Sequence, residues 1–111
     1  MVETIILEYL GTALNVPAYM EVPENPPEEY VVIEKTSSRM TNQLQGASLA
    51  VQSIAASLYD AAVLNETVKT AMNSAVALPA IARCHLETDY NFTNTATKQY
   101  RYQAIYDLVF Y

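Results

Sequence analysis

The sequence contains one cysteine, one histidine, two glycines and no tryptophan in 111 residues, and each scarcity removes a class of function. A single cysteine forms no intramolecular disulfide, so nothing points to an oxidising compartment. One cysteine and one histidine cannot supply the four ligands of a structural zinc site. Two isolated glycines, Gly11 and Gly46, exclude a glycine-rich phosphate-binding loop. We therefore expect no cofactor, no metal ion and no nucleotide hydrolysis.

Basic residues and long apolar runs are also scarce. Six basic against twelve acidic residues give a net charge of −6, the wrong sign for gripping phosphate backbones. No apolar run approaches the roughly 18 residues of a membrane span, and the N-terminus lacks the positive start of a signal peptide. We expect a soluble chain with no specific nucleic-acid contact and no membrane contact. Half of the residues (51%) are hydrophobic, enough for one domain spanning 1–111.

The acidic residues are concentrated at one end of the sequence. Seven of the twelve precede the first basic residue, Lys35, so residues 1–34 carry −7 while the remainder carries +1. Such a bias is typical of a solvated acidic face. It also suits a surface that repels polyanions or meets a basic partner.

Apolar periodicity predicts the elements of the first half. Residues 2–14 have helical spacing, and 18–22 is typical of a short strand that ends at Pro23. Residues 30–35 are β-branched and apolar on both faces, which predicts a central strand. Residues 36–43 have no apolar period, which predicts a polar, mobile connection, the longest loop of the chain.

The second half contains a strand, a helix and a final hairpin. Residues 46–54 alternate as a strand does, although their alanines would also suit a helix. Ser57 and Asp60 match the capping-box pattern and predict a helix over 57–76. Residues 81–90 alternate with one wet face, and a polar loop at 91–98 connects them to an aromatic-rich strand at 100–110.

Together these elements predict a fold class. The order is helix, three strands, helix, two strands. We expect a single α+β domain with a mostly antiparallel or mixed sheet of about five strands and two helices packed on one face.

Few residues offer chemistry. Cys84 and His85 are neighbours in a predicted strand, so their side chains should point to opposite faces and form no common site. An enzyme would need a pocket built on His85, Glu87 and Asp89, which the alternation places on the wet face of that strand. The domain also carries nine tyrosines, and Tyr9, Tyr19, Tyr30 and Tyr111 exceed what so small a domain readily encloses, which predicts contacts between chains.

Several stretches resemble a known family. The segment 16–36, VPAYMEVPENPPEEYVVIEKT, looks like the start of tail terminator (tail-completion) proteins from phages and prophages of Gram-positive bacteria. Ala50–Ser53 followed by Ser57–Ala62 is similar to that family's passage from strand to helix. Tyr90–Lys98, with Tyr100–Ala104 and Asp107–Tyr111, is similar to its final hairpin. None of these stretches is a catalytic motif.

The resemblance implies a structural virion protein, not an enzyme. Such proteins form a ring, hexameric in related phages, on the head-proximal end of the tail tube, where they stop tube growth and offer a docking surface for the head. The implied partners are other copies of the chain, the tail tube protein and the head–tail connector proteins, with DNA passing through unbound. The implied location is the virion tail, after assembly in the host cytoplasm. The residues expected at subunit interfaces or in the ring opening are Glu24, Glu28, Glu29, Arg39, Met40, Asn91 and Lys98.

Two alternatives remain open at this point. One is a head–tail adaptor or head-closure protein of the same assembly module. The other is a small host enzyme or enzyme subunit that uses the wet face of residues 81–90.

Overall fold

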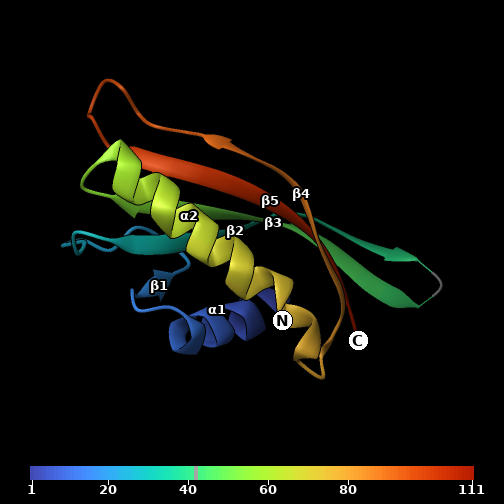
Figure 1. Ribbon diagram of the computed structural model, residues 1–111. Coiled ribbons are helices and arrows are strands. Elements are labelled where there is room, and N and C mark those ends of the chain that lie inside the picture. The colour runs from blue at the N-terminus through green and yellow to red at the C-terminus, as the bar shows by residue number, and fades with distance from the viewer. Residues whose placement is uncertain (42) are drawn as a thin grey trace.

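The computed structural model describes residues 1–41 and 43–111 and consists of two α-helices, a short 3-10 helix and five strands (Figure 1). The elements, in chain order, are α1 (Val2–Ala13), β1 (Ala18–Tyr19), β2 (Tyr30–Thr41), β3 (Leu44–Ala55), α2 (Leu58–Asn73), η1 (Ala75–Ala77), β4 (Ile81–Asn91) and β5 (Tyr100–Phe110). This order confirms the predicted α+β class.

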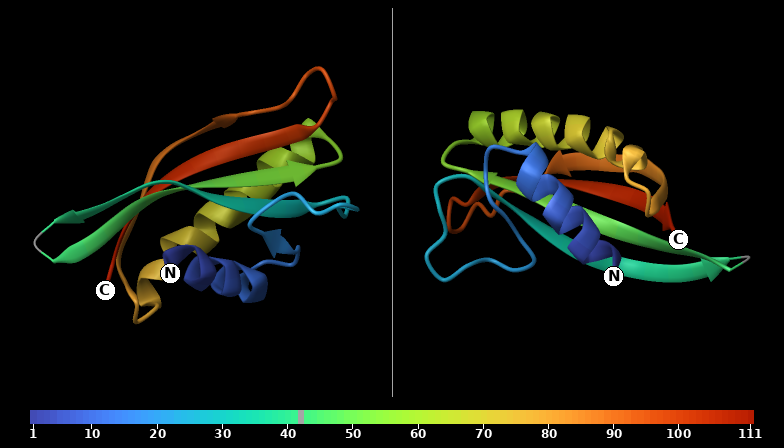
Figure 2. Two further views of the ribbon diagram at one scale, coloured as in Figure 1. Left: turned by 180° about the vertical axis from the view of Figure 1, so that it is seen from behind. Right: turned by 90° about the horizontal axis from the view of Figure 1, so that it is seen from below.

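All five strands belong to one sheet, in the order β1-β2-β3-β5-β4. The β1–β2 pair is parallel, and the other three pairs are antiparallel. Both α-helices lie on the same side of the sheet, as Figure 2 shows. We call this side the helix face and the other side the open face.

The main core lies between the helices and the helix face. Odd-numbered residues of β3, such as Leu49 and Val51, and even-numbered residues of β5, such as Tyr106 and Leu108, pack there against the apolar sides of α1 and α2. The helix α2 begins as its sequence predicts, because the Ser57 side chain accepts a hydrogen bond from the backbone N–H of Asp60 (3.1 Å).

The expectation that the domain cannot enclose Tyr9, Tyr19, Tyr30 and Tyr111 is wrong for Tyr30, while Tyr9 and Tyr19 are half-buried. Tyr30 is only 2% exposed and makes an edge-to-face contact with half-buried Tyr19 on the open face (6.0 Å between ring centroids). Half-buried Tyr9 donates from its hydroxyl to the Ala71 carbonyl, at 2.7 Å. The domain buries Tyr30 fully and the other two rings in part, because both faces of the sheet carry apolar clusters. Only Tyr111 remains strongly exposed among the four (75%).

The polar segment 36–43 is largely strand, which corrects the predicted loop. β2 runs on to Thr41, and Ser37, Ser38, Arg39, Met40 and Thr41 all pair with β3. Cross-strand backbone hydrogen bonds with β3 supply the stability that this segment's polar composition does not indicate. Asn42, which the same prediction covered, lies outside the described residues.

The first two strands also differ from their predictions. β1 ends at Tyr19, not Val22, because it pairs in parallel with β2 and the chain must travel back before Tyr30 can lie alongside. β2 is not central either, since β1 covers only Val31 and Val32 along its outer edge. The centre of the sheet is β3, which is paired along both edges.

Two irregularities interrupt β4, one between Ile81 and Arg83 and one between Leu86 and Thr88. At the second, Glu87 is an extra residue, so the alternation of faces changes beyond it. His85 and Thr88 therefore lie on the open face, while Cys84, Leu86 and Asp89 lie on the helix face. The sequence had placed His85, Glu87 and Asp89 on one face. The structure contradicts that placement.

Candidate interaction surfaces

The interface candidates predicted from the sequence fall at two opposite ends of the molecule. Arg39 and Met40 lie near the turn of the β2–β3 hairpin. The segment 20–29 and the β4–β5 hairpin lie at the far end, as all three ribbon views show (Figures 1 and 2). A hydrogen bond from the Gln99 side chain to the Tyr30 hydroxyl (3.4 Å) joins the β4–β5 hairpin to the start of β2, directly after the segment 20–29.

At the β2–β3 end, Arg39 forms an ion pair with Asp107 of β5 on the open face. To reach it, the Arg39 side chain passes over Gly46 of β3, its partner across the strand pair. Beside it, the Met40 side chain points to the helix face and is 68% exposed. Leu44 is also exposed here. This end therefore carries apolar side chains that nothing in the described part of the chain covers.

At the far end, the β4–β5 hairpin is held by its own side chains. The Asn91 carboxamide accepts hydrogen bonds from the backbone N–H (3.0 Å) and the hydroxyl (2.6 Å) of Thr93. The Arg101 guanidinium lies over the Phe92 ring, 4.5 Å from its centroid. Lys98 is exposed in the turn with a positive φ of 55°. Asn91 therefore shapes this hairpin, whereas Lys98 presents its charge to solvent.

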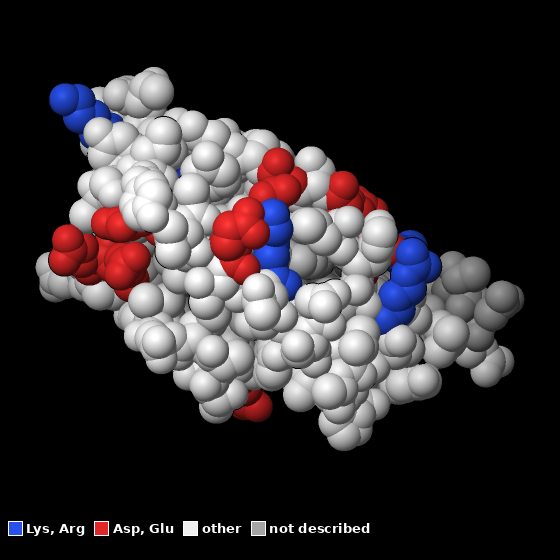
Figure 3. Space-filling view, viewed as in Figure 1, with Lys and Arg blue, Asp and Glu red and all other residues white. Residues whose placement is uncertain are grey.

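The acidic candidates lie beside that hairpin. Glu24, Glu28 and Glu29 are all exposed within the segment 20–29. In Figure 3, acidic side chains gather at the end of the molecule where this segment runs in Figure 1. The charge bias of the sequence thus becomes a local acidic surface.

The sheet has two outer edges, and sequence reasoning missed both of them. On β2, residues Ile33–Met40 have no strand partner on their outer side within the described ranges. On the opposite side of the sheet, β4 pairs only with β5. Such edges present unpaired backbone N–H and C=O groups. Finding them from the sequence would have required the strand order, which no local pattern contains.

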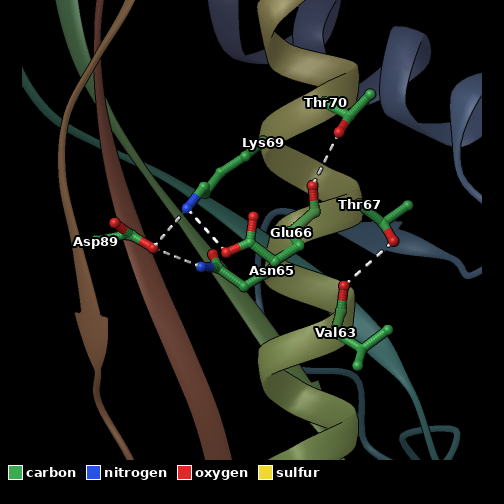
Figure 4. A network of polar contacts seen from close by, with 7 residues as sticks. All are labelled: Val63, Asn65, Glu66, Thr67, Lys69, Thr70 and Asp89. Carbon is green, nitrogen blue, oxygen red and sulfur yellow. Dashed lines mark hydrogen bonds and ion pairs between the residues drawn. The ribbon is translucent and has the colours of Figure 1, made fainter.

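A polar network connects α2 to β4 on the helix face (Figure 4). The Asp89 carboxylate accepts hydrogen bonds from the Asn65 side-chain amide (2.9 Å) and from the Lys69 ammonium group (3.1 Å). Lys69 also donates to Glu66, at 3.1 Å. Its bonds to Glu66 and Asp89 raise the pKa of Lys69 above the usual value. The network fixes α2 against the edge strand.

A cavity of about 350 Å³ adjoins this network between α2 and β4. Its lining includes Cys84, Leu86, Lys69 and Tyr106. Burial, with a smaller contribution from Asp107, raises the pKa of the Cys84 thiol to about 11, so the thiol is protonated at neutral pH. His85 lies on the other side of the sheet. The pocket that an enzyme would build from His85 and Asp89 on one face therefore does not form.

No protein-family model matches this chain, and no curated protein matches it. Among the helices of the described residues, none is long and apolar enough to cross a membrane.

Proposed function

We propose that this chain is a structural subunit of a ring at the head-proximal end of a phage tail tube, where it stops tube growth and offers the surface on which the head docks. The observation that carries the proposal is the pair of unpaired sheet edges, one on β2 and one on β4, on opposite sides of one domain. A closed ring needs heterologous contacts, in which two different surfaces of each copy meet.

The sequence resemblance supports the same proposal from another direction. Its longest stretches, 16–36 and 90–98, contain five of the seven candidate interface residues, namely Glu24, Glu28, Glu29, Asn91 and Lys98. The resemblance also implies the copy number, since rings of related phages are hexameric. Partners would be the tail tube protein on one side of the ring and head–tail connector proteins on the other.

The acidic segment gives such a ring a way to pass DNA without binding it. We place Glu24, Glu28 and Glu29 at the ring opening, where their charges would repel the phosphate backbone. Changing all three to glutamine removes this repulsion and should slow DNA ejection from assembled virions. Unchanged ejection would argue against a position in the opening.

The proposal is tested by asking what the purified protein assembles into and what it binds. Negative-stain electron microscopy and native mass spectrometry should show closed rings with a central hole. Mixed with tubes of the tail tube protein from the same phage, the protein should cap tube ends and stop their elongation. Binding to DNA-filled heads without capping of tubes would identify a head–tail adaptor instead. If the protein neither forms rings nor caps tubes, both assignments are rejected.

A further inference from the structure

We propose that copies of this chain join through their sheets, with the outer edge of β2 in one copy pairing antiparallel with the outer edge of β4 in the next. This inference adds the subunit contact to the proposed function, and it rests on that proposal for the claim that the assembly closes into a ring. The pairing between β2 and β4 concerns only these two strands, so it can be tested separately from ring closure and from the proposed function.

Strand direction is the first argument. β2 runs opposite to β3, β3 opposite to β5, and β5 opposite to β4, so β2 and β4 run in opposite directions. A second copy generated by rotation about an axis along the strands keeps these directions. Its β4 then meets β2 in the antiparallel sense, and the alternation of the sheet continues from copy to copy. Closing the circle pairs the open stretch of β2 with that of β4, which removes most of the hazard that open edges pose.

Register is the second argument. Side chains on paired strands must share a face, and each edge contains an irregularity at which the alternation changes. In β2 the irregularity leaves out Thr36, between Lys35 and Ser37. In β4 it leaves out Glu87, between Leu86 and Thr88. Two registers keep every face matched while the two irregularities fall within one pair of each other. The register that sets Lys35 opposite Leu86 also sets Arg39 opposite Arg83, which brings like charges together, so we choose the other. It sets Met40 opposite Cys84, Arg39 opposite His85, Ser38 opposite Leu86, Ser37 opposite Thr88, Lys35 opposite Asp89, Glu34 opposite Tyr90 and Ile33 opposite Asn91.

The side chains that this register brings together are complementary. Exposed Met40 meets Cys84 at the cavity between α2 and β4, where Leu86 offers further apolar surface. Lys35, which pairs with Glu3 within its own domain, meets Asp89, which pairs with Lys69, so the contact joins two existing ion pairs of opposite charge on the helix face. The pairing therefore covers the apolar side chain that the single domain leaves exposed at this edge.

The sharpest test is a disulfide between the open-face residues Ser37 and Thr88, which are both exposed and small. We would introduce Ser37→Cys and Thr88→Cys in a Cys84→Ala background and oxidise the protein with copper phenanthroline. Every copy then carries one thiol for each neighbour. Head-to-tail pairing should give a ladder of covalent trimers, tetramers and larger species on a non-reducing gel.

Matched controls separate this pairing from others. Each single cysteine variant should remain uncross-linked, because head-to-tail pairing places two different positions opposite each other. A single cysteine would cross-link only if β2 paired with β2 or β4 with β4, and the product would then be a dimer. Ser38→Cys with Thr88→Cys should also fail to cross-link, since these side chains lie on opposite faces. On assembly, the backbone amides of residues 33–40 should exchange more slowly with solvent.

The outcomes distinguish the pairing from the proposed function. Rings seen by native mass spectrometry without a ladder would overturn the edge pairing and leave the ring standing. A ladder from a protein that caps no tail tube would support the pairing and reject the terminator function. Dimers from a single cysteine variant, or no ladder and no assembly up to the solubility limit, would overturn the pairing.

Discussion

The Arg39 side chain lies across the Cα of Gly46, so any side chain at this position of β3 would have to displace the end of the Arg39 side chain. A Cβ built on Gly46 would lie 2.9 Å from both Cζ and Nε of Arg39. Glycine at this position lets the guanidinium group reach Asp107 on the neighbouring strand. The backbone of Gly46 has no positive φ, so close approach rather than turn geometry explains the glycine.

Gly46→Ala should therefore uncouple Arg39 from Asp107. We expect Asp107→Asn to cost about 0.5–1 kcal/mol of unfolding free energy in the parent, the range of partly exposed ion pairs, and close to nothing in the Gly46→Ala background. Urea denaturation of the four proteins measures this coupling. An equal cost of Asp107→Asn in both backgrounds would show that Arg39 keeps its partner.

Asp89 should contribute more to stability than Lys69 does. Asp89→Ala leaves the Asn65 amide, 1% exposed, without its carboxylate acceptor, and an unsatisfied buried donor costs about 2 kcal/mol. Lys69→Ala removes a partly exposed ion pair, so we expect a loss below about 1 kcal/mol. Urea unfolding at neutral pH compares the two variants. Equal losses would contradict the role assigned to Asn65.

Cys84 should make stability depend on pH in the alkaline range. The pKa of its thiol is about 11 in the folded protein against 9.0 ordinarily, so the folded state binds the proton more tightly. The contribution of the protonated thiol to the free energy of unfolding is complete below pH 9.0 and is lost as the pH rises through about 11. Urea midpoints of the parent should fall over this range more steeply than those of Cys84→Ala, in which tyrosine titration is retained. Parallel curves would show that the thiol is not shielded.

Lys98 should be a position at which glycine stabilises the fold. Its φ of 55° lies in the left-handed region, which disfavours residues with a Cβ. Lys98→Gly should raise the unfolding free energy by about 0.5–1 kcal/mol. The substitution relieves backbone strain in the folded state, and the greater conformational entropy of glycine in the unfolded chain offsets part of this gain. Lys98→Ala serves as the control for loss of charge and should give no gain. Thermal unfolding monitored by circular dichroism distinguishes these results.

Local patterns predicted most of the elements correctly. The period of residues 58–73, with Ser57 before them, specifies α2 in any context, because the amphipathic face and the cap are both local features. The alternation along 100–110 likewise specified β5. The placement of the Cys84 and His85 side chains on opposite faces of the sheet followed from strand geometry alone.

Candidate surfaces were harder to predict than elements. Glu24, Glu28 and Glu29 are exposed and together, as their shared segment suggested. Asn91, in contrast, turns its side chain to the backbone of its own hairpin. The open edges of β2 and β4 are properties of strand order, which pairing between distant segments decides.

The sequence by itself determined the helices, most of the strands, the class of the fold and the acidic character of one segment, because each depends on residues close together in the chain. Only the tertiary structure decided that polar residues 36–41 form strand and that Glu87 is an extra residue that turns Asp89 towards α2. Both outcomes depend on a partner strand distant in the sequence, whose backbone hydrogen bonds outweigh the local preference of the side chains.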